Sequence, residues 1–309
     1  MQFFPASGLS GKCLEINWAN RQDALMMLLV PADVLRPRRP DEHFAAEAEA
    51  ARAAGIDVAV IDHDALSKPD GGEHAVSRVP AGDDAIYRGW MLRSEHYATF
   101  AAALARRGVI LRTNAEQYRR AHELPGWYSS LETLTPRSAW TVGDDRDAFD
   151  RAREELGSGS AVLRDYTKSM KHYWHEAAFI PELDDPDAAW AVASRFRQLR
   201  EDDMTGGFVL RRFENFVSAE VRTWWIDGTC LLAGPHPDTP DDLPTTELDL
   251  SPLQPMIAEL NLPFVTADLA LRADGRWRVI ELGDGQVSDR PTTITPHAMI
   301  TMLNAGSLQ

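Results

Sequence analysis

The segment VTADLALRADGRWRVIELGDGQ, residues 265–286, decides the predicted fold, because it has the pattern of two strands joined by a tight turn. Asp274-Gly275, set between apolar runs, is a strong signal for a two-residue hairpin loop. Such a loop determines the register of the strands on either side of it. The pairs expected to face each other are Ala273–Arg276, Leu271–Arg278, Leu269–Ile280 and Asp268–Glu281.

The expected meeting of Asp268 and Glu281, with Cβ atoms roughly 5 Å apart, has a chemical consequence. Like charges that face each other destabilise a sheet unless something neutralises them. A hard divalent cation does so, and magnesium typically takes one or two carboxylates together with substrate phosphates. Asp284 follows where the chain turns and is a candidate third ligand. The alternative is a surface hairpin whose acids occur by chance or pair with Arg272 and Arg278.

A short basic segment supplies candidate phosphate ligands. The chain contains four lysines, and two of them, Lys168 and Lys171, follow Arg164 closely. In an acidic chain this cluster is suited to hold the phosphates of a nucleotide. Its glycine and lysine spacing differs from that of a Walker loop. The alternative is a solvated loop that carries basic residues.

A second cationic set lies further along, where Arg211 and Arg212 precede Glu220 and Arg222. On a strand, Glu220, Arg222 and Trp224 share one face. Arg222 is then held beside Glu220, in a position to bind a carboxylate or a transferred phosphate. A structural ion pair on the sheet is the alternative interpretation.

Arg88, in the stretch YRGW at residues 87–90, ends a predicted strand of the N-terminal part. Open sheets place ligands at that edge, so Arg88 is a candidate substrate ligand. A buried arginine that ties two domains together is the alternative.

The composition is that of an ordinary globular protein, with 44% apolar and 26% charged residues. The formal charge of −15 argues against a general affinity for nucleic acid or for an anionic membrane. Cys13 and Cys230 lack metal-ligand spacing, which favours a reducing compartment. The N-terminus has no signal-peptide pattern, and the apolar run Ala24–Val30 is too short to cross a bilayer. Together these features predict a cytoplasmic protein.

The order of predicted elements indicates two parts. Residues 1–125 alternate between helices at 44–54 and 95–107 and strands at 56–61, 85–90 and 109–111, which predicts an α/β unit with a parallel sheet. Residues 126–309 contain a glycine-serine turn at 157–160, strands at 161–165 and 175–180, and a helix from Asp185 to about Arg200. A strand at 208–213 and two hairpins, the first across Asp227-Gly228, follow. The predicted class is α+β after an α/β start.

In this order the segments resemble the ATP-grasp superfamily, in a bacterial branch marked by characteristic arginines and a lysine. The resemblance covers most of the chain from about Tyr87 onward. It implies an ATP-grasp fold with a lid subdomain at about 137–207 and a C-terminal subdomain at about 208–309, which enclose the nucleotide. A substrate-side α/β domain precedes them. The family's basic strand, adenine linker and two acidic strands correspond to residues 161–168, 209–214, 266–269 and 279–286.

The resemblance also implies roles for individual residues. Arg164, assisted by Lys168, takes the place of the phosphate ligand on the first strand, where lysine is usual. Asp268 and Glu281 resemble the magnesium ligands. Asparagine is typical two residues after the glutamate, where this chain has Gly283, so Asp284 remains a candidate. The other implied roles are nucleotide binding by Arg211, Arg212, Phe213, Glu214 and Glu220, catalysis by Arg222 and Lys168, and substrate binding by Arg88 and Gln286.

By this resemblance the protein uses ATP and Mg²⁺ to join a small or peptide carboxylate to an amine through an acyl-phosphate, with release of ADP. A closed lid protects such an intermediate from water, and residues 157–160 and 166–174 are its expected mobile parts. Family members are often dimers, so a homodimer is expected. A phosphotransferase on the same scaffold is one alternative. A non-catalytic nucleotide-binding protein is another, favoured by the arginine in place of lysine and by the missing asparagine.

Overall fold

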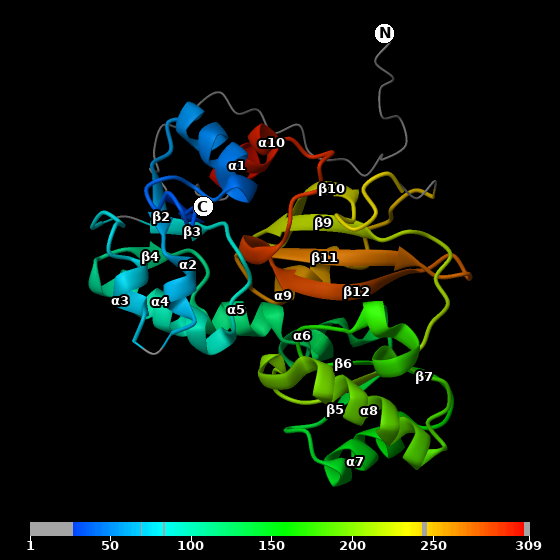
Figure 1. Cartoon of the computed structure of the whole chain (residues 1–309). Helices are drawn as coiled ribbons and strands as arrows, with labels where there is room; N and C mark the ends of the chain where they lie inside the picture. The colour runs from blue at the N-terminus through cyan, green and yellow to red at the C-terminus, as the bar shows by residue number, and fades with distance from the viewer. Residues whose placement is uncertain (1–26, 69, 83, 243–245, 306–309) are drawn as a thin grey trace.

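The structure is a computed structural model that describes residues 27–68, 70–82, 84–242 and 246–305. Cys13 and the N-terminal segment considered above lie outside the described residues. Three four-stranded sheets form the framework, and Figure 1 shows them in three lobes: an N-terminal lobe, a C-terminal lobe beside it, and a lid lobe below. Among the described helices, none combines the length and apolar character needed to cross a membrane.

The N-terminal sheet is parallel, in the order β2-β1-β3-β4. Apolar side chains bury its strands on both faces, as is typical of parallel sheets covered by helices. The strands are β1 (Met27–Pro31), β2 (Val58–Ile61), β3 (Asp84–Tyr87) and β4 (Ile110–Leu111). The helices are α1 (Glu42–Ala53), α2 (His63–Leu66), α3 (Gly72–Ala75), α4 (Ser94–Arg106) and α5 (Ala115–His122). The predicted parallel sheet is confirmed.

The lid sheet is antiparallel, in the order β5-β8-β6-β7. Its strands are β5 (Ser138–Trp140), β6 (Ala161–Arg164), β7 (Phe179–Ile180) and β8 (Val209–Arg212). Helices α7 (Arg146–Leu156) and α8 (Pro186–Arg200) bury one face, and Asp185 caps α8 as predicted. The expected strand at 175–180 is mostly wrong, because Trp174–Ala178 forms a π-helical turn and leaves two residues for the strand.

The C-terminal sheet has the order β10-β9-β11-β12, and every neighbouring pair is antiparallel. Its strands are β9 (Val221–Ile226), β10 (Thr229–Pro235), β11 (Phe264–Leu271) and β12 (Trp277–Asp284). Asp227 and Gly228 form the predicted two-residue turn, both with positive φ. Helix α10 (Pro296–Ala305) returns to pack beside α1, as Figure 1 shows.

The hairpin β11–β12 differs from the predicted register in its outer part. Its loop has three residues, because Arg272 pairs with Arg276 and Gly275 takes a positive φ of 82°. The observed pairs are therefore Leu271–Trp277 and Leu269–Val279, and the predicted Leu271–Arg278 and Leu269–Ile280 pairs are wrong. A bulge between Asp268 and Leu269 adds one residue on β12 and cancels the shift. Asp268 faces Glu281, as predicted.

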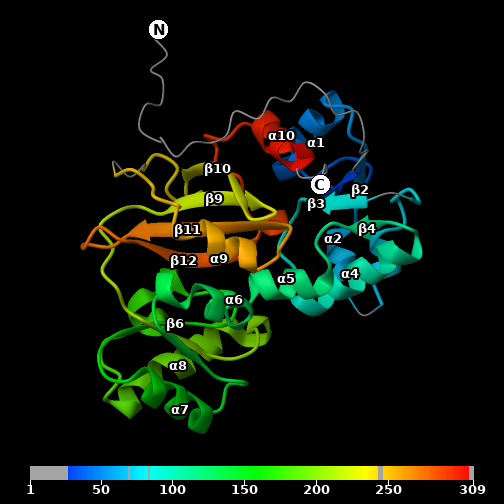
Figure 2. The ribbon, with the colours of Figure 1, turned by 180° about the vertical axis from the view of Figure 1, so that it is seen from behind.

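The two faces of the C-terminal sheet have different surroundings. Helices α6 (Leu124–Leu131) and α9 (Gln254–Glu259) cover one face, where Trp225, Val265 and Leu282 join a shared core. Figure 2 shows both helices on this side of the sheet. Arg222 and Asp268 alternate with these core residues and so lie on the other face. That face therefore carries the charged residues.

Candidate functional site

Asp268 lies on the inner strand β11, directly opposite Arg222 of β9. The carboxylate accepts two hydrogen bonds of 2.8 Å, from Nε and Nη2 of Arg222. His236 completes the group, with its Nε2 atom 3.5 Å from Asp268 Oδ2 and 2.9 Å from Arg222 Nη2. Burial by itself would raise the pKa of Asp268, but Arg222 and His236 outweigh burial and lower that pKa to about 2. Asp268 is therefore an ionised, buried carboxylate.

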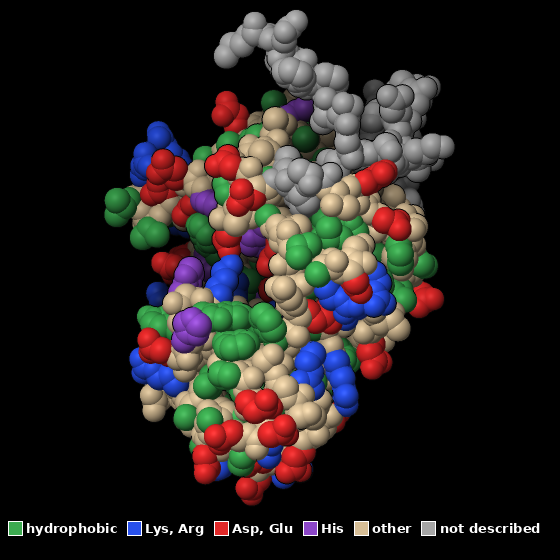
Figure 3. All heavy atoms as spheres, turned by 90° about the vertical axis from the view of Figure 1, so that its right-hand side faces the viewer, with side chains coloured by type: hydrophobic (Ala, Val, Ile, Leu, Met, Phe, Trp, Pro, Cys, Tyr) green, Lys and Arg blue, Asp and Glu red, His purple; other side chains and the backbone are tan. Residues whose placement is uncertain are grey.

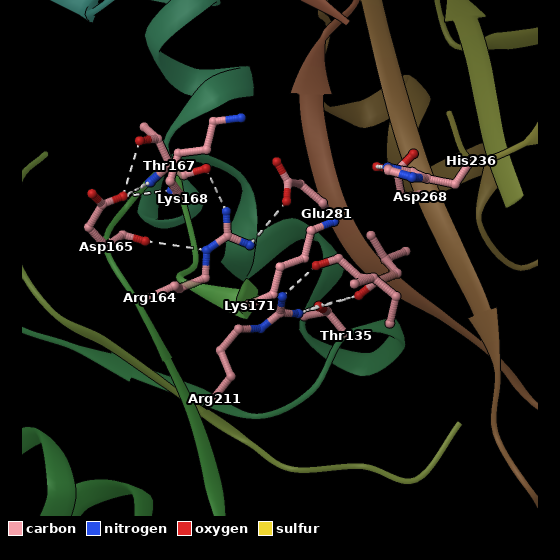
Figure 4. A network of polar contacts seen from close by, with 12 residues as sticks. Thr135, Arg164, Asp165, Thr167, Lys168, Lys171, Arg211, His236, Asp268 and Glu281 are labelled. Atoms are coloured by element: carbon pink, nitrogen blue, oxygen red, sulfur yellow. Dashed lines mark hydrogen bonds and ion pairs between the residues drawn. The ribbon is translucent and has the colours of Figure 1, made fainter. Parts of the chain in front are cut away.

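Glu281 lies across the ladder on β12 and contacts the lid. Its Oε2 atom is 3.3 Å from Nη1 of Arg164, which belongs to β6. Burial would raise the pKa of Glu281, but the charges of Arg164 and Lys168 lower it below its usual range despite the nearby Asp268. Figure 4 shows Glu281 between Arg164 on one side and Asp268 with His236 on the other. The two acids predicted to meet do so, and each has a cation from another strand.

The loop after β6 is built around Asp165, which is fully buried. Its Oδ1 atom accepts hydrogen bonds from the backbone N–H groups of Thr167 (2.7 Å) and Lys168 (2.6 Å). Its Oδ2 atom accepts one from Nε of Arg200 at 3.0 Å. The backbone that carries Lys168 is thus held in place. The Nζ atom of Lys168 has no hydrogen-bond or ion-pair partner in the described part of the chain, and Figure 4 shows it extending away from Asp165.

Lys171 makes a second connection between the lid and the C-terminal lobe. Its ammonium group pairs with the carboxylate of Asp238, in the loop after β10. Both side chains are about half exposed, so the pair contributes little to stability. Figure 3 shows a hollow between the two lobes, with side chains of both charge signs and histidines at its mouth. The phosphate candidates Arg164 and Lys168 lie on the lid side of the site.

The linker residues predicted at the nucleotide are largely engaged within the protein. Arg211 is buried and donates to the carbonyl oxygen of Ile280 and to Thr135 Oγ1 (2.6 Å), while burial lowers its pKa to about 9. Arg212 donates to carbonyl oxygens of the turn that contains Gly157. These contacts give Arg211 and Arg212 positioning roles for the bulge and the turn.

Glu214 and Phe213 follow in the same linker. Both carboxylate oxygens of Glu214 accept hydrogen bonds from Arg278, at 2.9 and 2.8 Å. Phe213 keeps 38% of its surface exposed and lies against Phe179 and Trp174. Of the four linker candidates, Phe213 is the one whose side chain stays accessible to a ligand.

Arg88 adopts the alternative arrangement considered above, a buried arginine that joins two lobes. It is 1% exposed and donates to both oxygens of Glu47, at 2.9 and 3.2 Å. Its Nη1 atom donates to the carbonyl oxygens of Gly285 (2.7 Å), Gln286 (3.2 Å) and Ser288 (2.9 Å). The structure thus places Arg88 in a connection between α1 and the end of β12, separate from the acid pair.

Gln286 and Asp284 belong to the same connection. Gln286 accepts from the backbone N–H of Tyr87 (3.0 Å) and donates to Tyr97 Oη (2.7 Å) and Asp284 Oδ1 (3.1 Å). Asp284 is three residues after Glu281, so the alternation of the strand turns it to the other face. Its Oδ2 atom is buried with no hydrogen-bond partner, and burial raises its pKa to about 7. The structure does not bring Asp284 to Asp268 and Glu281.

Glu220 does join the charged group, although Arg222 pairs with Asp268 and not with Glu220 as expected. Ligand atoms of Glu220, His236 and Asp268 all lie within 4.8 Å of one another. Burial and the charge of Asp268 raise the pKa of Glu220. The structure therefore gathers three acids, Glu220, Asp268 and Glu281, with three cations from the lid and β9.

Two histidines contribute to this region without a signal in the sequence. His236 follows β10 and meets Asp268 from a different part of the chain. His122 ends α5, is 7% exposed, and stacks at a tilt on Tyr118 with ring centroids 5.2 Å apart. Burial lowers the pKa of His122 to about 4, with Glu281, Lys168 and Arg164 as its nearest charges. Spacing could not find either residue, because their partners are distant in sequence.

Comparison with known proteins agrees with this arrangement. A family model of the ATP-grasp domain, the third family of its clade, matches residues 155–303, which include both acids and the lid strand of Arg164. No curated protein sequence matches the chain. The chain is a member of the ATP-grasp superfamily.

Solved structures show the same fold. The RimK domain ATP-grasp protein from Sphaerobacter thermophilus has 18% identity and a TM-score of 0.59, with 92% of this chain and 100% of that chain covered. D-cycloserine synthetase DcsG has 17% identity and a TM-score of 0.59, covering 91% and 99%. The ATP-grasp ligase PsnB, complexed with minimal precursor, Mg and ADP, has 16% identity and a TM-score of 0.55, covering 93% and 100%. The fold of this chain is therefore ATP-grasp.

Proposed function

We propose that this protein is an ATP- and Mg²⁺-dependent ligase that activates a carboxylate as an acyl-phosphate and joins it to an amine. The observation that carries this proposal is the opposition of Asp268 and Glu281, each paired with an arginine of another strand. Proteins of the same fold support it, since PsnB is described as an ATP-grasp ligase complexed with Mg and ADP, and DcsG as a synthetase.

The donor set fits magnesium. Glu220, Asp268 and Glu281 offer carboxylate oxygens, which Mg²⁺ prefers. The raised pKa of Glu220, caused by burial and by Asp268, reflects a crowding of negative charge that a dication relieves. Asp268 and Glu281 would hold the ion, as the family resemblance implies. When bound, Mg²⁺ would neutralise charge on the phosphoryl oxygens.

Arg222 and Arg164 would then change partners. In the structure they neutralise Asp268 and Glu281, and a bound cation would take over that task. The guanidinium groups would be released to bind the γ-phosphate, a planar fork being well suited to phosphate oxygens. Lys168, whose Nζ is unpaired in the described residues, would add a third positive charge to the transferring group.

The chemistry then balances in two steps. A substrate carboxylate oxygen attacks the γ-phosphorus, and the bond from this phosphorus to ADP breaks. An amine nitrogen attacks the carbonyl carbon of the acyl-phosphate, phosphate leaves, and the amine proton passes to solvent. The contacts from Arg164 to Glu281 and from Lys171 to Asp238 hold the lid against the C-terminal lobe, which would limit the entry of water.

The test compares Glu281→Gln with Glu259→Gln, an exposed control on α9. We expect wild type and control to bind ATP in a Mg²⁺-dependent manner by calorimetry and to release ADP in the presence of acid and amine. Glu281→Gln should lose at least about 100-fold in ADP release, the effect of removing one preorganised charge, while its far-ultraviolet circular dichroism stays unchanged.

Two outcomes would contradict the proposal. Unchanged ADP release in Glu281→Gln would remove Glu281 from the reaction. Absence of Mg²⁺-dependent ATP binding in the wild type would instead indicate a non-catalytic protein. Mass spectrometry of the products separates ligase from phosphotransferase, since only the ligase requires the amine and forms a C–N bond.

A further inference from the structure

A cavity of about 190 Å³ lies where the N-terminal lobe meets the lid. Residues Met91–Ser94, after β3, form one wall, and the lid loop with Thr167 and Lys168 forms another. His122, at the end of α5, and Arg200, at the end of α8, also line it. None of the substrate candidates from the sequence contributes to this cavity.

His122 is the first indication that the cavity takes a ligand. Its side chain is 7% exposed, and in the described residues neither ring nitrogen has a hydrogen-bond or ion-pair partner. Buried polar groups in proteins are nearly always hydrogen-bonded. Since His122 lines the cavity, a ligand bound there could supply the missing partner. Burial keeps the ring neutral, so it can donate from one nitrogen and accept at the other.

The charges around the cavity indicate the sign of that ligand. Lys168, Arg93 and Arg200 line it, while Asp203 is the acid among its lining residues. Asp203 is 81% exposed and already pairs with Arg93 at 3.3 Å. Arg200 is held by Asp165, but the Nζ atom of Lys168 is unpaired among the described residues. An anionic group beside Lys168 would satisfy this excess of positive charge.

The location links the cavity to the reaction. Glu281, Lys168 and Arg164 are the charges that act most strongly on His122, so the cavity adjoins the acid pair. Lys168 belongs to both, as a lining residue and as a cation near Glu281. An anion on Lys168 would thus lie next to the place where the γ-phosphate is expected.

The volume limits the size of the ligand. The cavity equals about six water molecules at roughly 30 Å³ each. Pockets for drug-sized ligands span roughly 300–1,000 Å³. A compact acid of the size of an amino acid fits, and the side of a peptide that lies inside would be limited to one residue.

We propose that this cavity binds the carboxylic acid substrate, a compact acid whose carboxylate contacts Lys168 Nζ and whose second polar group contacts His122. This inference rests on the proposed ligase function and adds to it the acid's binding site and size. His122 is then a residue that determines specificity, since it binds the part of the acid that does not react.

The experiment uses hydroxylamine as a general nucleophile, so that any acyl-phosphate is detected as a hydroxamate. The wild-type chain is screened with MgATP against the free L-amino acids and short mono- and dicarboxylic acids. Three variants follow: His122→Gln, which changes the polar partner, Met91→Trp, which fills the cavity, and His297→Gln, an exposed control on α10. Calorimetry of MgATP binding is recorded for each of them.

We expect a compact acid to give hydroxamate with the wild type and the control. His122→Gln should raise the KM for that acid at least tenfold with a smaller change in kcat, and Met91→Trp should abolish hydroxamate formation. Both variants should bind MgATP within twofold of wild type, which also shows that they fold.

Three results would overturn the inference. Wild-type KM values in both cavity variants would place the acid elsewhere. Hydroxamate formation with peptides alone would exclude the proposed size. Failure of the wild type to bind MgATP would remove the ligase function itself, and that failure is distinguishable because it shows in calorimetry before any acid is added.

Discussion

Arg222 and Asp268 face each other on neighbouring strands and form two parallel hydrogen bonds of 2.8 Å. This pair occupies the carboxylate that we propose as a metal ligand. The protein therefore neutralises its acids with its own arginines, and metal binding must compete with an internal cation. A buried charge that loses its partner is strongly unfavourable, so the exchange should depend on MgATP arriving as a unit.

Arg222→Met tests this competition. Without its guanidinium, Asp268 and the nearby Glu220 are left as uncompensated acids. We expect MgCl₂ alone to raise the thermal unfolding midpoint of Arg222→Met more than that of wild type, while ADP release falls roughly 100- to 1,000-fold. Arg151→Met, an exposed substitution on α7, is the control. Equal responses of variant and wild type to MgCl₂ would show that Arg222 does not compete with a cation.

Arg88→Met should be severely destabilising. The substitution leaves Glu47 buried with its remaining partner Arg290 and removes the donor from three carbonyl groups. Breaking a buried ion pair costs about 3–5 kcal/mol of unfolding free energy, which urea denaturation measures against the exposed control Arg38→Met.

Arg88→Lys should recover only part of this loss, because an ammonium group cannot form the bidentate contact with Glu47. A different outcome would revive the substrate role predicted for Arg88. In that case the unfolding free energy stays at the wild-type value and the KM for the acid rises.

Asp284 should make stability depend on pH. Burial raises its pKa to about 7 in the folded protein, against about 3.9 for an unperturbed aspartate. The folded state therefore holds the proton more tightly. The contribution of Asp284 to stability is full below about pH 4 and is lost as the pH rises to about 7, by up to about 1.4 kcal/mol per pH unit.

The comparison with Asp284→Asn isolates this effect. The unfolding free energy of wild type minus that of Asp284→Asn should decrease between about pH 4 and pH 7 and remain constant above that range. Urea denaturation over a series of buffers provides the measurement, with Asp241→Asn as an exposed control. A difference that does not vary with pH would mean that Asp284 titrates alike in the folded and unfolded chains.

Local sequence patterns predicted the elements well where the contacts are local. The Asp227-Gly228 turn, the Asp185 cap and the parallel N-terminal sheet all appear, because turn and cap chemistry acts over a few residues. The pairing of Asp268 with Glu281 was also predictable, although its derivation assumed a loop of two residues. The three-residue loop and the bulge shift the register in opposite directions, so the error cancelled at the acids.

Partner choice was less predictable. Arg222 was expected beside Glu220, its neighbour in sequence, but it pairs with Asp268 on the adjacent strand. Arg211 was expected at the nucleotide but is buried beneath the bulge carbonyl of Ile280. Both outcomes depend on how separate segments pack, which spacing within one segment does not encode.

By itself, the sequence determined the hairpin, the acid pair, the basic lid strand and the likeness to ATP-grasp proteins. The tertiary structure decided which cation neutralises each acid, that Arg88 and Gln286 connect lobes, and that His122 lines a cavity with Lys168. The physical reason is the range of the interactions. Turns and strand alternation act between near neighbours in the chain, whereas burial and charge pairing depend on residues that only folding brings together.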